Sequence, residues 1–191
     1  MISEPWLGCW AELIGVGGVA YDIGANAGEW TRWLKERFAS VVSLEPDDRC
    51  EPPAGCRYDQ RAVWHTTGAG VLYRREMALQ SSLSSVHEMG NGGHAVNVVE
   101  TAVVPTVTLD DLATQYGLPD FIKIDIEGAE AEAIASATLP CFSQCRWVVE
   151  LHNTRDAVVE QFERLGYENC EIIKHPSPHA AAGHEWMLVT P

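Results

Sequence analysis

A tight glycine turn with an acidic residue in front of it follows the first apolar segment of this 191-residue chain. Residues 19–21 are apolar, Asp22 comes next, and a G-x-N-x-G turn then holds Gly24, Asn26 and Gly28. This order predicts a strand, a turn and a helix N-terminus, where a ligand can approach bare backbone and unpaired N–H groups. A purely structural turn is the alternative interpretation.

A second acidic residue, Glu45, ends the next apolar segment (residues 41–45) and lies 23 residues after Asp22. In dinucleotide-binding folds an acidic residue about 20 positions on accepts the ribose hydroxyls. Those folds carry a glycine where this chain has Asn26, and the Asp22 carboxylate would repel a pyrophosphate but attract an ammonium. S-adenosylmethionine has an ammonium and a sulfonium and no phosphate, so the pattern favours it over NAD. A solvated strand end is the alternative for Glu45.

Charged residues also interrupt a later apolar segment, residues 121–126, which contains Lys123 and Asp125 and is followed by Glu127. Charges inside an apolar run are costly unless they are paired or lie at the carboxyl end of a strand. Open parallel sheets bind ligands in the crevice at that end. We therefore expect Asp125 and Glu127 to face such a crevice, with Lys123 neutralising one of them; a structural Lys–Asp pair is the alternative.

The same arrangement recurs at residues 145–153, where Glu150 and His152 alternate at the end of an apolar run. Both side chains are expected at the same crevice. His152 is our first candidate for a catalytic base and Asp125 the second. Glu127 and Glu150 would orient a substrate. A divalent cation held by these two residues with Asp125 is a possibility that we do not favour.

Composition limits the class of protein and of partner. The length favours one domain over residues 1–191, and 46% hydrophobic residues can form a core. The formal net charge of −14 argues against nucleic-acid and anionic-membrane partners. The start of the chain does not resemble a signal peptide, and no stretch has the length of a membrane span, so we expect a soluble cytoplasmic protein. Six cysteines without a C-x-x-C pair indicate free thiols.

The elements that must position these side chains alternate between strand and helix patterns. We expect a short helix within residues 1–18, and a helical pattern that runs through Trp30, Trp33, Leu34 and Phe38. The segment after Glu45 is rich in proline, which predicts a helix reduced to a turn or two.

Further strands and helices follow. A third strand is predicted at 57–64, with Ala62 small enough to let an adenine ring approach. Residues 65–107 break the strand–helix rhythm and predict an inserted β-hairpin region that acts as a lid beside the site. Thr108 is the expected N-cap of a helix that Gly117 ends. Two final strands are expected around 169–175 and 184–191.

Four motifs of the chain resemble the FkbM family of S-adenosylmethionine-dependent methyltransferases. They are DIGANAGEWT (22–31), VVSLEPD (41–47), PTVTLDDL (105–112) and DFIKIDIEGAEAEAI (120–134). The resemblance covers about residues 19–152. It implies a three-layer αβα Rossmann-like methyltransferase fold, with a mostly parallel seven-stranded sheet, an antiparallel last strand and the inserted hairpin region. It further implies transfer of a methyl group to a hydroxyl oxygen of a sugar or natural product.

The resemblance also implies roles for individual residues. The methionine end of the cofactor would be surrounded by Asp22, Gly24, Asn26 and Gly28. Glu45 would take the ribose hydroxyls and Ala62 would border adenine. Asp125 would lie opposite the sulfonium, and Ser82 would face the cofactor from the insertion. Expected partners are a small hydroxylated acceptor and, at most, a second copy of the chain in a homodimer. An NAD-dependent oxidoreductase and a non-catalytic cofactor-binding domain are the rival functions.

Overall fold

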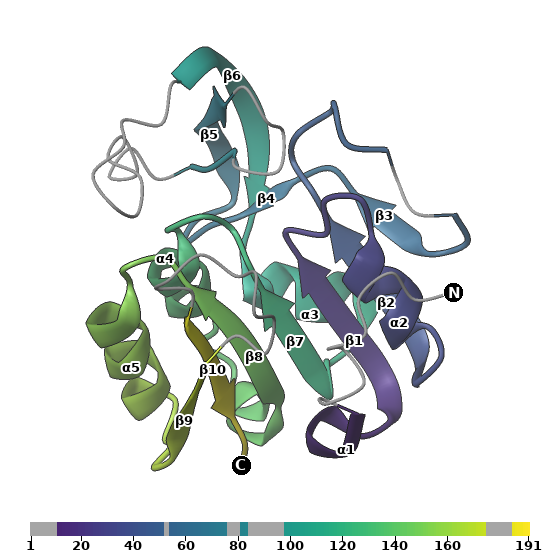
Figure 1. Cartoon of the computed structure of the whole chain (residues 1–191), viewed down its shortest axis with the longest axis vertical. Helices are drawn as coiled ribbons and strands as arrows, with labels where there is room; N and C mark the ends of the chain where they lie inside the picture. Colours follow the sequence, from purple (N-terminus) through teal and green to yellow (C-terminus); the bar gives the residue numbers. More distant parts are fainter. Residues whose placement is uncertain (1–10, 52–53, 76–80, 84–97, 175–184) are drawn as a thin grey trace.

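The structure of the chain is a computed structural model that describes residues 11–51, 54–75, 81–83, 98–174 and 185–191 (Figure 1). Of the helix expected within residues 1–18, it describes α1 (Ala11–Ile14). Trp6, Leu7 and Trp10, which carried that expectation, lie outside the described residues.

A seven-stranded sheet forms the centre of the molecule, in the order β3-β2-β1-β7-β8-β10-β9. Strand β10 is antiparallel to both of its neighbours, β8 and β9, and the other pairs are parallel. The strands are β1 (Gly17–Ile23), β2 (Phe38–Leu44), β3 (Arg57–Asp59), β7 (Phe121–Ile124), β8 (Arg146–Leu151), β9 (Cys170–Lys174) and β10 (Glu185–Val189). The mostly parallel sheet with one antiparallel strand confirms the predicted fold class.

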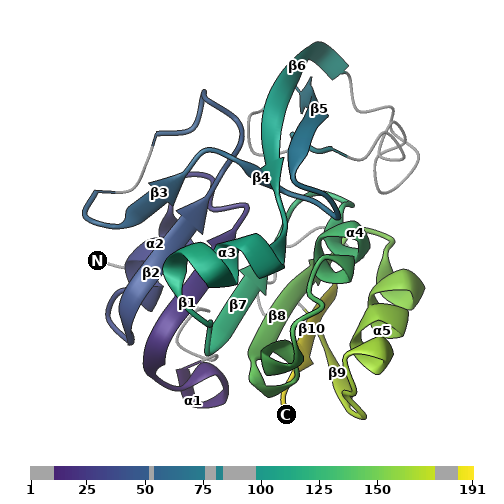
Figure 2. The same ribbon diagram turned by 180° about the vertical axis from the view of Figure 1, so that it is seen from behind.

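Helices cover both faces of this sheet and make three layers (Figures 1 and 2). One face carries α1 and α2 (Glu29–Leu34). The other carries α3 (Leu109–Tyr116), α4 (Glu130–Ala135), a 3₁₀ turn (Pro140–Gln144) and α5 (Arg155–Arg164). Helix α3 begins as predicted, because the Thr108 hydroxyl accepts a hydrogen bond of 3.1 Å from the Asp111 N–H.

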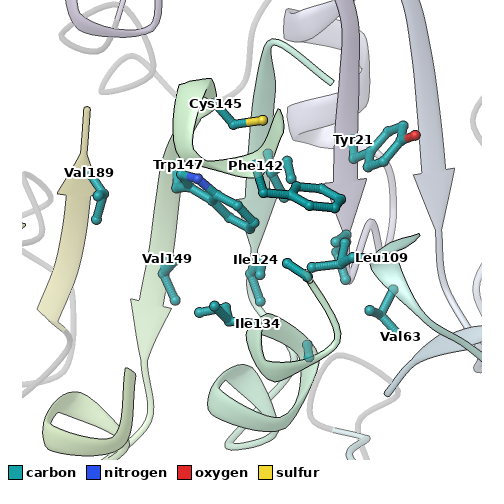
Figure 3. Packing of buried hydrophobic residues seen from close by; sticks show 14 of the residues in the cluster. Tyr21, Val63, Leu109, Ile124, Ile134, Phe142, Cys145, Trp147, Val149 and Val189 are labelled. Atoms are coloured by element: carbon teal, nitrogen blue, oxygen red, sulfur yellow. The ribbon is translucent and has the colours of Figure 1, made fainter. Parts of the chain in front are cut away.

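Each face of the sheet has its own apolar core. On the α3–α5 face, Phe142 packs beside Trp147, with Ile124, Ile134 and Val149 close to them (Figure 3). On the α2 face, Trp30 stacks on Trp186 with ring centroids 5.7 Å apart. Strands such as β7 and β8 are buried on both faces between the two cores, which is why their sequences are almost continuously apolar.

A second, three-stranded sheet stands beyond the carboxyl ends of the main strands (Figure 1). It consists of β4 (Ala62–Val63), β5 (Gly68–Arg75) and β6 (Val98–Val107), in the order β4-β6-β5. Strands β5 and β6 form an antiparallel pair, as the expected hairpin insertion requires, and β4 runs parallel to β6. The small sheet therefore begins at residue 62, a few residues earlier than predicted.

Three sequence-based expectations about elements were wrong. Phe38 does not continue the helix: α2 ends at Leu34, and Phe38 begins β2, where its ring stacks on Phe121 of β7. The strand predicted at 57–64 is two strands, β3 and β4, which belong to different sheets. The first strand, which the apolar pattern predicted from residue 19, begins two residues earlier, at Gly17 of β1.

Within the described part of the chain, no helix has both the length and the apolar character needed to cross a lipid bilayer.

Candidate functional site

A pocket lies at the carboxyl ends of β1, β2 and β7 and is closed on its outer side by the small sheet. Of the residues predicted to bind or react, those that line it are Gly24, Asn26, Glu45, Ala62, Ser82, Asp125 and Glu127. Its other lining residues are Ile23, Leu44, Pro46, Arg61, Val63, Leu72, Ser81, Leu83, Ile126 and Ala129. The crossover between β1 and β7 therefore places the ligand crevice where open α/β sheets usually have it.

Gly24 lets two main-chain segments approach closely at the floor of the pocket. Its φ is +74°, and a Cβ added there would lie 1.8 Å from the carbonyl oxygen of Asp125. The N–H groups of Gly24 and Ala25 both donate to the carbonyl of Leu44 at 2.9 Å. Only glycine fits this position, so the turn presents bare backbone to the pocket.

Glu45 closes the opposite side of the turn. Its carboxylate accepts hydrogen bonds from the N–H of Asn26 at 3.1 Å and from the N–H of Asp47 at 2.9 Å. Burial raises the pKa of Glu45 to about 7, although both backbone donors act in the opposite direction. The side chain is 8% exposed, so it is placed to accept a hydroxyl from a ligand in the pocket.

Asp22 lies beneath the turn and is not part of the pocket lining. It is fully buried, accepts a hydrogen bond of 2.6 Å from the Thr31 hydroxyl and lies 3.3 Å from the Lys123 ammonium. Lys123 also donates to the carbonyl of Gly24 at 2.7 Å. Asp22 and Lys123 thus fix the turn from below, and direct contact of Asp22 with a ligand stays a prediction.

Gly28 is also outside the lining and is the residue before α2. Its φ of +76° ends the turn, and its N–H donates to the carbonyl of Ala25 at 2.7 Å. Gly28 therefore shapes the turn without lining the pocket.

The wall of the pocket opposite the glycine turn is largely apolar. Ala62 and Leu72 come from the small sheet, and Leu83 follows the isolated bridge between Tyr73 and Ser82. The Ser82 hydroxyl donates to the carbonyl of Ile126 at 3.1 Å, which joins the insertion to the loop after β7. A flat apolar ring fits against such a wall.

A charged network holds this wall in place. The Arg49 guanidinium contacts both carboxylate oxygens of Asp47, at 2.6–3.2 Å, and donates to the hydroxyl of Ser81 at 3.0 Å and to the carbonyl of Arg75 at 3.0 Å. Ser81 in turn donates to Asp47 at 2.6 Å. Burial alone would raise the pKa of Asp47, but the hydrogen bonds from Arg49 and Ser81 lower it to about 2.

His152 lies beside the pocket but outside its lining, surrounded by carboxylates. Its Nδ1 is 2.9 Å from Glu130 Oε1, and its Nε2 is 3.6 Å from Glu127 Oε2 and 3.9 Å from Asp125 Oδ1. Burial lowers the pKa of His152, but the hydrogen bond to Glu130 and the charges of Glu130, Glu127 and Asp125 outweigh it and raise the pKa to about 10. The carboxylates around the imidazole therefore favour its protonated form.

Glu127 and Glu150, the expected substrate-binding residues, both lie near this histidine. Burial raises the pKa of Glu127 to about 7, and the nearby carboxylates of Asp125 and Glu150 act in the same direction. Glu150 is 8% exposed and is not in the pocket lining. Asp125, Glu150 and His152 offer donor atoms within 4.8 Å of one another, a spacing that one divalent cation could bridge.

Around Asp22 and His152, three residues were not predicted from the sequence: Thr31, Glu130 and Thr154. Glu130 is fully buried and joins His152 to the start of α4. Its signal in the sequence was weak, because an acidic residue in the first turn of a helix is common for electrostatic reasons alone. Thr31 and Thr154 are hydroxyl residues whose carboxylate partners become evident only when the strands are aligned.

Comparison with protein families places the whole site inside one known domain. The model described as "Methyltransferase FkbM domain" matches residues 22–168. This range begins at Asp22 and includes the glycine turn, Glu45 and His152. No curated protein sequence matches the chain.

A solved structure shares this fold at low sequence identity. "Methyltransferase FkbM from Methylobacillus flagellatus KT" matches with a TM-score of 0.60 and 15% identity, over 94% of this chain and 45% of that one. The present chain thus spans less than half the length of that protein. An rRNA methylase from Streptococcus thermophilus (TM-score 0.49, 12% identity, 100% and 98% coverage) and a putative methyltransferase from Streptococcus mutans in complex with SAH (0.48, 9%, 99% and 98%) are weaker likenesses that support no argument.

Proposed function

We propose that this chain, which belongs to the FkbM methyltransferase family, uses S-adenosylmethionine as a methyl donor. The acceptor is a hydroxyl oxygen of a sugar or natural-product-like small molecule. The observation that carries the proposal is the pocket itself. A glycine turn with no room for a Cβ, a buried carboxylate at Glu45 and an apolar wall meet beside a histidine set among carboxylates.

The charges of the pocket support a cationic cofactor without phosphate groups. Glu45, Asp125 and Glu127 line it, and the guanidinium of Arg61, which also lines it, is bound by Asp59 at 2.5 Å. Three carboxylates would repel the pyrophosphate of NAD and would attract a sulfonium and an ammonium.

In the proposed complex each part of the cofactor meets a matching surface. The adenine lies against the apolar wall that contains Ala62, with Ser82 facing it from the insertion. Glu45 accepts the ribose hydroxyls, and the turn at Gly24 and Asn26 holds the methionine end above Asp22 and Gly28. The sulfonium faces Asp125.

The reaction is an in-line displacement. The acceptor oxygen bonds to the methyl carbon while the carbon–sulfur bond breaks, and its electron pair stays on sulfur. Alignment of these atoms can supply roughly 7–11 kcal/mol of the barrier. His152 Nε2 takes the hydroxyl proton, a step worth roughly 10²–10⁴-fold in rate, and Asp125 is the second candidate.

For this role, His152 must first lose the proton that its carboxylate neighbours favour. A sulfonium bound beside Asp125 offsets part of their negative charge, which lowers the pKa of the imidazole when the cofactor is present. A bound cofactor would therefore favour the neutral imidazole that a general base requires.

Glu127 and Glu150 orient the acceptor in this proposal. Their charges, with a formal net charge of −14 for the chain, support a neutral small molecule over a phosphorylated acceptor, a nucleic acid or an anionic membrane. A cytoplasmic location is part of the proposal, and it is supported by the free thiols of Cys50, Cys56, Cys141, Cys145 and Cys170. The proposal applies to a monomer and to a homodimer alike.

Calorimetry and product analysis test the proposal. We expect heat of binding with S-adenosylmethionine but not with NAD, and formation of S-adenosylhomocysteine with a neutral hydroxylated acceptor from a panel. The His152→Ala variant should bind the cofactor but lose most turnover. Binding of NAD alone would favour an oxidoreductase, and cofactor binding without product across the panel would favour a non-catalytic domain.

A divalent cation at Asp125, Glu150 and His152 remains the less favoured alternative. We expect turnover to survive treatment with a chelator, because the Lys123 ammonium, 3.6 Å from Asp125 Oδ2, already gives that carboxylate a positive partner. Activity that disappears with the chelator and returns with Mg²⁺ would establish the cation instead.

A further inference from the structure

Glu130 connects the candidate base to the protein interior. Its side chain is fully buried at the start of α4. Oε1 accepts hydrogen bonds from the Gly128 N–H at 2.8 Å and from His152 Nδ1 at 2.9 Å, and Oε2 accepts one from the Thr154 hydroxyl at 2.8 Å. A buried carboxylate is costly unless it is bonded in this way, so these contacts fix its position.

The contact with Glu130 decides which nitrogen of His152 faces the crevice. Because a carboxylate only accepts hydrogen bonds, Nδ1 carries a proton and donates it. Nε2 then points to the side of Asp125 and Glu127, both of which line the pocket. The imidazole therefore spans the distance between a buried carboxylate and the wall of the cofactor pocket.

We infer that Glu130 is a positioning residue for the methyl transfer, which holds His152 with Nε2 toward the acceptor hydroxyl. The inference rests on the proposed function. As the oxygen–carbon bond forms and the carbon–sulfur bond breaks, the hydroxyl proton moves to Nε2, and Glu130 stabilises the imidazolium through Nδ1–H. Thr154 keeps the carboxylate in place by its bond to Oε2.

The charge around the imidazole comes from several elements. Glu130 belongs to α4, Asp125 and Glu127 to the loop after β7, and Glu150 to β8, while Lys123 of β7 lies 3.6 Å from Asp125. Glu130 contacts the ring at 2.9 Å, compared with 3.6 Å for Glu127 and 3.9 Å for Asp125, and it is absent from the pocket lining. Its replacement should therefore change the chemical step without changing cofactor contacts.

Glu130→Gln tests this inference, because the amide keeps the size and hydrogen-bonding capacity of the side chain but removes its charge. We expect kcat to fall by roughly 10- to 100-fold, a part of what a positioned base supplies. The KM and Kd for S-adenosylmethionine should stay within about twofold of the unaltered protein, since Glu130 does not line the pocket. Thr154→Val should show a smaller loss of kcat in the same direction.

A spectroscopic readout separates positioning from a purely structural role. In the unaltered protein the Nδ1 proton of His152 should resonate at low field, as a proton bound to a carboxylate does, and the signal should be missing in His152→Gln. In Glu130→Gln it should move upfield or exchange away. Glu132→Gln, on the same helix, is the matched control and should leave kcat and the signal unchanged.

Two results would overturn the inference. One is a Glu130→Gln enzyme with unaltered kcat; the other is a low-field signal that is absent from the folded, unaltered protein. If the unaltered protein binds S-adenosylmethionine but methylates no acceptor, the proposed function fails, and the low-field signal still decides whether Glu130 holds His152.

Discussion

At Gly24 a side chain would need the space that the main chain of Asp125 already fills. We predict that Gly24→Ala weakens binding of S-adenosylmethionine by at least about 100-fold and destabilises the protein by roughly 1–3 kcal/mol, because the turn must open to admit a Cβ. Calorimetry and urea unfolding measure the two effects.

Gly166→Ala is the matched control for that substitution. Gly166 has a similar φ of +88°, but a Cβ there would meet no atom within 4 Å. The Gly166→Ala variant should lose only roughly 1–2 kcal/mol of stability, the cost of alanine in a left-handed backbone conformation, and should keep its cofactor affinity. Equal cofactor affinities for the two variants would show that the close approach at Gly24 is irrelevant to binding.

Glu45 makes cofactor binding depend on pH. Since burial raises its pKa to about 7, a part of the population is protonated at neutral pH and is a poorer acceptor for ribose hydroxyls. We predict that affinity for S-adenosylmethionine rises with pH through this range, by up to about tenfold per unit below the pKa. Glu45→Gln should bind more weakly and lose most of the slope, whereas an affinity that falls with rising pH would contradict the assignment.

The sequence identified those residues of the site whose signal is local. A glycine in a turn and an acidic residue about 20 positions later point to a ligand without any knowledge of partners. The pairing of Asp22 with Lys123 joins residues 101 positions apart, and that of Glu130 with His152 joins residues 22 apart. Such contacts depend on the strand order, which the hydrophobic pattern alone does not state.

Among the elements, the small sheet depends on the charged network around Asp47 for its attachment to the pocket. We predict that Asp47→Asn increases hydrogen exchange of the β5 amides and weakens S-adenosylmethionine binding by roughly 3- to 10-fold, since Arg49 and Ser81 lose a charged partner worth about 1.5–3 kcal/mol per hydrogen bond. Hydrogen exchange followed by mass spectrometry measures the first effect.

Asp48→Asn is the control for this substitution. Asp48 pairs with Arg74 at 2.6 Å, but its side chain is 61% exposed, and Arg74 keeps Glu100 at 3.3 Å and Asp47 at 3.9 Å as partners, so loss of this pair should cost little. If hydrogen exchange in β5 became faster in Asp48→Asn and stayed unchanged in Asp47→Asn, the small sheet would be attached through Asp48 and not through Asp47.

Elements with strong periodicity or clear end signals were predicted well, and the boundary errors have physical causes. The cap at Thr108 and the end at Gly117 fix α3. By contrast, the alternating pattern of 57–64 is the same whether it serves one sheet or two, so the break between β3 and β4 is invisible. Phe38 fits a helical period by coincidence and is placed by its stacking on Phe121.

For the whole molecule, the buried ionisable groups predict a stability that declines as the pH rises. Glu45 and Glu127 keep raised pKa values of about 7 in the folded state, and His152 one of about 10. The folded protein therefore binds more protons than the unfolded chain, and its free energy of unfolding falls as pH rises. The contribution of the two glutamates to stability is lost as the pH rises to about 7. The contribution of His152 is complete below the ordinary pKa of histidine and is lost as the pH rises to about 10.

Urea unfolding of the ligand-free protein at a series of pH values checks this prediction. The low pKa of Asp47, about 2, adds stability that is lost only in acid. We therefore expect the free energy of unfolding to be greatest at about pH 5. His152→Gln should flatten the decline above about pH 7. A free energy of unfolding that increases steadily from weakly acidic to alkaline conditions would show that these groups are not buried as described.

The small sheet also has a consequence for how new acceptor specificities could be made. The chain leaves for the hairpin at β4 and comes back through the end of β6, and the two passages are paired directly, Ala62 with Thr106 and Val63 with Val107. This excursion is fastened at its root, next to the cofactor wall. A foreign loop grafted between Leu83 and β6 would thus keep Ser81, Ser82 and Leu83 in the pocket lining, and laboratory evolution could diversify the outer part without rebuilding the cofactor pocket.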